Sequence, residues 1–121
     1  MEVAVNTTAS TAITGAAVNY IEMDGGGGQP GVAIGVVPAM SALAAAETVT
    51  VSIIRLDTGA VIGSSVFTNS GAGASTGGPV VVVAPIPAGM AGGIALAITG
   101  SVATGNVLGS ATAPITLTRL P

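Results

Sequence analysis

The stretch TVTVSIIRL, residues 48–56, determines the fold class that we expect for this chain. Valine or isoleucine occupies every second position at its start, and threonine or serine fills the positions between them. Successive side chains of a β-strand point to opposite faces, so this period of two places the apolar residues on one face and the hydroxyls on the other. The stretch therefore predicts a strand with one buried face.

The same alternation appears on both sides of this stretch. In GIALAITGS (93–101) and PITLTRL (114–120), apolar residues again alternate with small or hydroxyl-bearing ones. Glycine, proline, asparagine and serine separate the runs, a spacing typical of an all-β sandwich or barrel. We therefore expect about eight short strands. The remaining runs are EVAV (2–5), AAVNYIEM (16–23), GVAIGVV (31–37), AVIGSSVF (60–67) and PVVVVAPI (79–86).

The length of the chain favours one domain. It has 121 residues, and ~100–200 residues per domain is the usual range. We expect residues 1–121 to form a single antiparallel β-sandwich of the jelly-roll or Greek-key type. Two glycine-rich segments, 24–31 and 69–78, are expected to be flexible loops. The alanines of PAMSALAAAE (38–47) favour a short helical turn.

The segment PVVVVAPIPAGMAGGIALAI (79–98) has the length of a membrane-spanning helix but a composition that favours strands. It contains no charged residue, and ~20 apolar residues suffice to cross a bilayer. Pro85 and Pro87 lie in its middle, where proline breaks helical hydrogen bonding, and four consecutive valines favour a strand. We interpret the segment as two strands joined by a turn, and we expect no membrane insertion.

Charged residues are unusually scarce. Only 6% of the residues are charged, compared with ~25% in ordinary soluble domains. The chain has two arginines, five acids and neither lysine nor histidine, and residues 58–118 carry no charge at all. A free monomer normally needs more surface charge to stay dispersed. We therefore expect that copies of the chain, as a trimer or dimer, or another partner cover much of the surface.

The composition argues against several classes of function. Nucleic acid binding requires Lys and Arg to displace phosphate counterions, and two arginines with a net charge of −3 do not supply them. Without cysteine or histidine, the chain lacks thiol nucleophiles, zinc–thiolate sites and a histidine base for a serine. We expect no enzyme activity, no cofactor and no metal. The acid at Glu2, where a secretion signal has basic residues, indicates no such signal.

Four consecutive glycines stand in EMDGGGGQPGVAIGVV, residues 22–37. A phosphate-binding loop needs glycines between a strand and a helix, and its P-loop form adds a lysine. Here a second strand-like run follows, and the chain has no lysine. Glu22 and Asp24 precede the glycines, but a Ca²⁺ site needs ~6–8 oxygen ligands. We interpret the glycines as a turn between strands.

The stretch RLDTGAVIG (55–63) resembles the catalytic signature of retroviral-type aspartic proteases. The resemblance implies that Asp57 is the catalytic carboxylate of a homodimer and that Thr58 and Gly59 support its turn. A second element of that family resembles Val107-Leu108-Gly109, although residues 110–114 lead into a strand rather than a helix. Aspartate and glycine are also favoured turn residues. Our preferred interpretation is a hairpin turn between the runs 48–56 and 60–67.

About the last 75 residues resemble jelly-roll modules of phage virions. The similarity lies in AETVTVSIIRLDTGAVIGSSV (46–66) followed by VVVVAPIPAGMAGGIALAITGSVATGNVLGSATAPITLTRLP (80–121). The chain looks most like a capsid decoration, or cement, protein. The resemblance implies a structural virion protein that binds the major capsid protein and stabilises the assembled phage capsid. Such a protein would be made in the host cytoplasm and lie on the capsid surface. The resemblance assigns no catalytic, cofactor-binding or metal residue.

Three other functions remain open on the sequence. The first is a phage fibre or tail-tip receptor-binding module, the second is the aspartic protease using Asp57, and the third is a bacterial surface or adhesion domain.

Overall fold

The computed structural model describes residues 3–7 by their backbone and residues 10–121 in full. All regular elements in these residues are strands, which confirms the all-β class. The strands are β1 (Val3–Thr7), β2 (Thr11–Ala12), β3 (Val18–Asp24), β4 (Gly31–Val37), β5 (Ala39–Leu43), β6 (Thr48–Arg55), β7 (Val61–Thr68), β8 (Ser75–Gly77), β9 (Val80–Ile86), β10 (Gly93–Gly100), β11 (Asn106–Leu108) and β12 (Ile115–Leu120).

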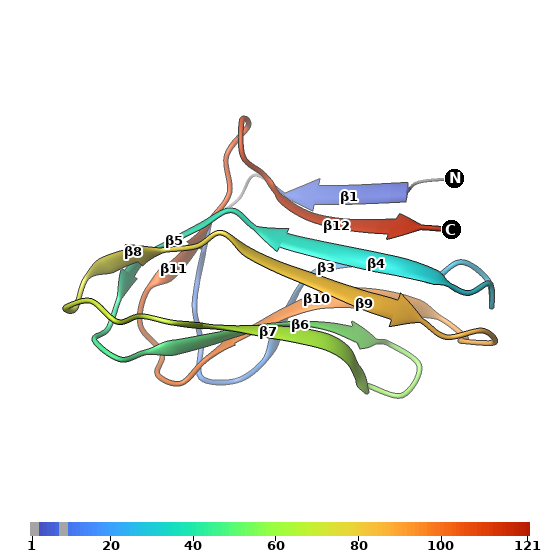
Figure 1. The fold of residues 1–121 in the computed structure, drawn as a ribbon, viewed down its shortest axis with the longest axis horizontal. Coiled ribbons are helices and arrows are strands. Elements are labelled where there is room, and N and C mark those ends of the chain that lie inside the picture. Colours follow the sequence, from blue (N-terminus) through green and yellow to red (C-terminus); the bar gives the residue numbers. More distant parts are fainter. Residues whose placement is uncertain (1–2, 8–9) are drawn as a thin grey trace.

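The strands form three antiparallel sheets of four strands each. The first sheet has the order β1-β12-β4-β9, the second β3-β10-β6-β7 and the third β2-β11-β5-β8. The first and second sheets lie face to face as the two layers of a sandwich (Figure 1).

The third sheet continues the first beyond a bend. Its strands stand in the same order as their counterparts in the first sheet, and only Pro38 separates β4 from β5. Gly78 and Pro79 separate β8 from β9 at the same level, because Val37 pairs with Val80. Proline has no N–H to donate to a strand ladder. The two prolines therefore interrupt neighbouring strands together, and the sheet bends there (Figure 1).

The pairing of the strands defines a jelly roll. If β1 is counted with β2, β4 with β5, β8 with β9 and β11 with β12, the chain has eight strand lengths. The first pairs with the last (β1 with β12), the second with the seventh (β3 with β10), the third with the sixth (β4 with β9) and the fourth with the fifth (β6 with β7). This nested pairing over two layers is the jelly-roll arrangement that the sequence predicts.

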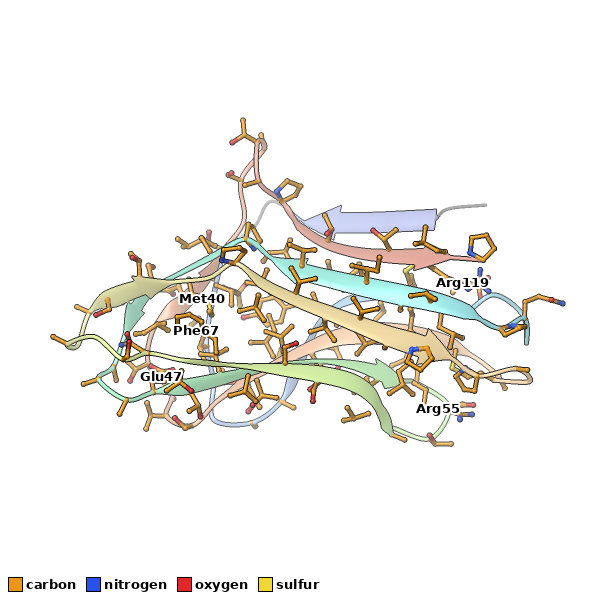
Figure 2. The ribbon with its side chains drawn as sticks, in the orientation of Figure 1. Met40, Glu47, Arg55, Phe67 and Arg119 are labelled. Carbon is orange, nitrogen blue, oxygen red and sulfur yellow. The ribbon has the colours of Figure 1, made fainter. Side chains whose placement is uncertain are left out.

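The core fills the space between the inner faces of the two layers (Figure 2). Gly35 of β4 faces Leu96 of β10, and a methyl group added at Gly35 would lie 2.5 Å from Cδ1 of Leu96. The missing side chain at Gly35 thus leaves room for Leu96, which is fully buried. The largest fully buried apolar side chains are Met40, Leu43, Ile53, Met90, Ile94, Leu96, Ile98, Ile115 and Leu117.

The two layers also meet along one edge, where β7 lies beside β9. A methyl group at Gly63 of β7 would lie 2.6 Å from Cβ of Ala84 and 3.1 Å from the carbonyl oxygen of Val83. Ser65 Oγ donates a hydrogen bond of 2.9 Å to the carbonyl oxygen of Val81. Gly63 therefore permits the close approach that shuts this edge of the sandwich.

Each of the eight runs predicted as strands overlaps a strand of the structure. The helical turn predicted for residues 38–47 is wrong, because Ala39–Leu43 is strand β5. Its Met40 and Leu43 are fully buried, and Met40 pairs with Val107 of β11. Burial and pairing outweigh the weak intrinsic preference of alanine for helix. The segment 69–78, predicted as a loop, contains the short strand β8.

We predict that Gly63→Ala destabilises the protein by about 1–3 kcal/mol, the usual cost of overpacking a close contact. The added methyl group would meet the backbone of β9, which has little freedom to move away. Chemical denaturation measures the effect. Gly15→Ala is the matched control, because a methyl group there has no neighbour within 4 Å. Equal stabilities of the two variants would contradict the proposed role of Gly63.

Candidate functional site

Three loops and both arginines gather at one end of the sandwich. Arg55 and Arg119 lie at this end, and the buried acid Glu47 lies at the opposite end (Figure 2). The three loops are the glycine loop between β3 and β4 (25–30), the turn between β6 and β7 (56–60) and the loop after β9 (87–92). The loop after β9 contacts both of the others. The amide of Gly89 in that loop donates a hydrogen bond of 2.8 Å to the carbonyl oxygen of Gly28, and the amide of Ala91 donates one of 3.2 Å to Oδ2 of Asp57.

The four consecutive glycines, Gly25–Gly28, wrap around the guanidinium group of Arg119. Nε of Arg119 donates a hydrogen bond of 3.0 Å to the carbonyl oxygen of Gly25, and Nη2 donates one of 3.2 Å to that of Gln29. The Arg119 residue is only 8% exposed. The glycines form a turn between β3 and β4, as predicted. The structure adds a reason for their presence, since the loop backbone solvates an arginine 90 residues away in sequence.

Gly26 is the glycine that this arrangement requires most. Its φ of +96° lies in the region that side chains disfavour, and a methyl group there would overlap the guanidinium group of Arg119. Gly27 also has a positive φ, of +64°, but a methyl group there would have no neighbour within 4 Å. An alanine at Gly27 would therefore cost backbone strain alone, whereas an alanine at Gly26 would also displace Arg119.

We predict that Gly26→Ala destabilises the protein by roughly 2 kcal/mol or more, because left-handed strain of ~1–3 kcal/mol adds to the loss of the arginine contacts. Gly27→Ala should cost ~1 kcal/mol, the usual penalty for alanine in this conformation. Thermal or chemical unfolding of both variants provides the measurement. If Gly27→Ala is as destabilising as Gly26→Ala, the loop does not hold Arg119.

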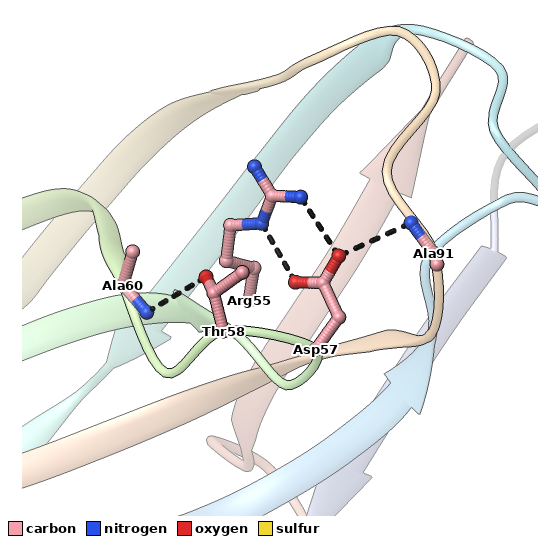
Figure 3. A network of polar contacts seen from close by, with 5 residues as sticks. All are labelled: Arg55, Asp57, Thr58, Ala60 and Ala91. Carbon is pink, nitrogen blue, oxygen red and sulfur yellow. Dashed lines mark hydrogen bonds and ion pairs between the residues drawn. The ribbon is translucent and has the colours of Figure 1, made fainter.

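Asp57 lies in the turn between β6 and β7 and forms a two-pronged ion pair with Arg55 (Figure 3). Nε and Nη2 of Arg55 each donate a hydrogen bond of 2.7 Å to a carboxylate oxygen. The hydrogen bonds from Arg55 lower the pKa of Asp57 below its ordinary value of 3.8, although partial desolvation opposes them. The same contacts raise the pKa of Arg55. The carboxylate is therefore held as an anion.

The turn itself is the hairpin that the sequence predicts. Gly59 adopts a φ of +77°, and its amide donates a hydrogen bond of 2.8 Å to the carbonyl oxygen of Arg55. Thr58 Oγ1 accepts a hydrogen bond of 3.3 Å from the amide of Ala60. Within one chain, the second protease-like element, Val107-Leu108-Gly109, is not beside Asp57, because β11 and the β6–β7 turn lie at opposite ends of the sandwich (Figure 1).

We predict that Asp57→Asn lowers the melting temperature at neutral pH and that this difference disappears in acid. The folded-state pKa of Asp57 is below the unfolded value near 3.8, so its contribution is present above that value and is lost as pH falls through the folded pKa. The measurement is the melting temperature of both proteins from pH 7 to pH 2. The difference between the two melting temperatures cancels the effect of the other acids, because both proteins contain them. A difference that does not change with pH would contradict the ion pair.

The acids before the glycine loop accept hydrogen bonds from neighbouring residues of the chain. Glu22 and Asp24 are exposed, and Oδ1 of Asp24 accepts a hydrogen bond of 3.4 Å from the amide of Gly26. Oε2 of Glu22 accepts one of 3.2 Å from Asn19. In residues 3–7 and 10–121, no three acids are close enough together to hold a metal ion.

Glu47 is a buried acid that the sequence does not single out. It is 1% exposed, and its Oε1 accepts a hydrogen bond of 2.8 Å from the amide of Ala44 across the turn before β6. Within the described part of the chain, Oε2 has no hydrogen-bond partner. Gly100 makes room for it, because a methyl group there would lie 3.0 Å from Oε2. Oε1 of Glu47 therefore closes the turn before β6.

The outer face of the first sheet is a candidate binding surface. We call the outward side chains of β9, β4 and β12 the uncharged face. Pairing between these strands aligns them in three rows, each with one residue from every strand. Val83 is 62% exposed and Val81 is 50% exposed. The rows are Val81-Val36-Thr116, Val83-Ile34-Thr118 and Pro85-Val32-Leu120.

Every side chain of the uncharged face is apolar or carries a hydroxyl. Strand β4 lies in the uncharged region 25–46, and β9 and most of β12 lie in the uncharged region 58–118. The only charged residue on these three strands is Arg119, which points inward. Contiguous exposed apolar patches on soluble proteins commonly mark interaction sites. The alternation in the sequence predicts these outward positions, but only the sheet order brings them together.

No known protein family matches the chain, and no curated protein sequence is significantly similar to it. In the part of the chain that the structure describes, no helix is long and apolar enough to cross a membrane.

Proposed function

We propose that this protein is a structural component of a phage virion that binds the assembled capsid shell and stabilises it as a decoration, or cement, protein. The observation that carries the proposal is the uncharged face of β9, β4 and β12. The jelly-roll fold and the resemblance of residues 46–66 and 80–121 to virion modules are consistent with it.

The chemistry of the face fits a contact based on apolar burial. Branched apolar side chains and threonines stand on a pleated sheet, where they can pack against another apolar surface without leaving a charge unpaired. Such contacts depend weakly on salt, whereas contacts between charges are screened over ~10 Å at 0.1 M salt. The proposed partner is an equally uncharged surface of the major capsid protein.

The size of the face suggests that many copies act together. Three strands ~4.8 Å apart and three rows ~6.8 Å apart give a footprint of roughly 300 Å². A stable interface between two proteins buries ~800 Å² on each partner. One copy therefore gains modest affinity from this face, and a trimer or dimer bound to a shell of identical subunits gains more through avidity.

The turn at Asp57 supports this function over the protease alternative. A catalytic pair of aspartates shares a proton, which requires one carboxyl group with a raised pKa. The ion pair with Arg55 instead lowers the pKa of Asp57. The carboxylate fixes its own hairpin through Arg55 and joins it to the loop after β9 through the amide of Ala91, a structural role that explains its presence.

The test is binding to purified capsids that lack the protein. We expect wild-type protein to sediment with them at low salt and at about 1 M salt, since apolar contacts are weakly screened, and to raise their rupture temperature. Val83→Asp should lower occupancy at least roughly tenfold, because it places an unpaired charge in the contact.

Val66→Asp provides the matched control. Val66 is 60% exposed, which is close to the 62% of Val83, but it lies on β7 of the other sheet. It should bind as the wild type does. No binding of wild-type protein at either salt would refute the cement function and favour the fibre module. Equal losses in the two variants would refute the role of the uncharged face.

A further inference from the structure

The outer face of the second sheet contains a hollow of about 180 Å³. Its floor is Ala97 of β10, which is 4% exposed although it points outward. Ser52 of β6 and Asn19 of β3 are its paired neighbours on the two sides, and Ile54 and Val61 close one end. The hollow exists because a small side chain in the central strand lies between longer ones.

Hydroxyl and amide groups lie beside this floor, among apolar side chains. Thr50 and Ser52 lie two residues apart on β6, about 6.8 Å along the strand, and Thr99 is the paired neighbour of Thr50 on β10. Paired residues in antiparallel strands have Cα atoms ~4.5–5.5 Å apart. The three hydroxyl-bearing residues therefore form a triangle with sides of about 5–8 Å.

These polar groups have few partners within the protein. Among the described residues, the hydroxyls of Thr50 and Ser52 have no protein partner, and Thr99 Oγ1 makes one long contact of 3.4 Å with the carbonyl oxygen of Gly15. Nδ2 of Asn19 donates a hydrogen bond to Glu22, which leaves its Oδ1 available as an acceptor. The groups can thus donate to and accept from a ligand.

The lining selects the class of ligand. It includes no charged residue, so it offers nothing to neutralise a phosphate or carboxylate group. Most of the surface of the hollow is apolar, and the hydroxyls and the Asn19 amide lie among the apolar groups, so a ligand with both apolar and polar groups fits it better than a purely apolar side chain. A sugar ring has hydroxyls at its rim and C–H groups on its face. Its hydroxyls match the polar groups, and its C–H face matches Ala97 and Ile54.

We propose that this hollow binds a neutral sugar unit, such as the end of a glycan chain. The site is independent of the uncharged face, because it lies on the outside of the other layer of the sandwich. If the uncharged face rests on a capsid shell, the sugar site points away from the shell. A decorated capsid would then carry many copies of it toward its surroundings, and weak single contacts would add through avidity.

The test uses the isolated protein, labelled with ¹⁵N, and a panel of neutral hexoses, deoxyhexoses and N-acetylhexosamines. We expect at least one of them to cause saturable shifts in the NMR signals of Ser52, Ala97 and Thr99. The double variant Thr50→Val, Ser52→Ala removes two hydroxyls with little change of shape and should weaken binding roughly tenfold or more. Thr68→Val with Ser70→Ala is the matched control outside the hollow, and its affinity should equal that of the wild type.

Two results would overturn the proposal. The first is the absence of saturable shifts with every sugar of the panel. The second is sugar binding that the Thr50 and Ser52 variant leaves unchanged. Capsid binding is measured separately, so failure here does not refute the cement function, and failure of capsid binding does not refute the sugar site. If the same variant instead lowers capsid occupancy, the hollow contacts the shell and the proposal is wrong.

Discussion

The two layers of the sandwich approach closely at two points where glycine replaces a side chain. Gly35 leaves the space that Leu96 fills between the sheets, and Gly63 lets the edges of the sheets meet at β9. With 6% charged residues and 19 glycines, the chain gains little from ion pairs and must gain stability from apolar burial and from a well-formed strand ladder. Small residues at the points of contact make that burial dense.

The two arginines serve one end of the sandwich instead of its faces (Figure 2). Arg119 binds the carbonyl groups of the glycine loop, and Arg55 binds Asp57, which in turn accepts a hydrogen bond from Ala91. Both arginines therefore hold loops in place. As a consequence, the outer face of β9, β4 and β12 carries no charge and is free to pack against another apolar surface. The arginines that stabilise the loops are thus absent from the face that is proposed to bind.

Much of the fold could be predicted from the sequence, because a period of two identifies strands by a local pattern. The sequence does not show which distant segments pair. The contact between Arg119 and the glycine loop joins positions about 90 residues apart and has no local signature. Strand β5 was hidden by alanines that favour helix locally, and its burial against β11 is visible only in three dimensions. The candidate surfaces were missed for the same reason, since each combines several strands.

If the uncharged face rests on a capsid shell, the opposite sheet points outward. A cryo-electron microscopy reconstruction of capsids decorated with this protein measures this orientation. We expect Ile34 and Val83 to contact the major capsid protein, and β6 and β10 to form the outer surface of the particle. A reconstruction in which the protein is bound but β9, β4 and β12 face solvent would contradict it.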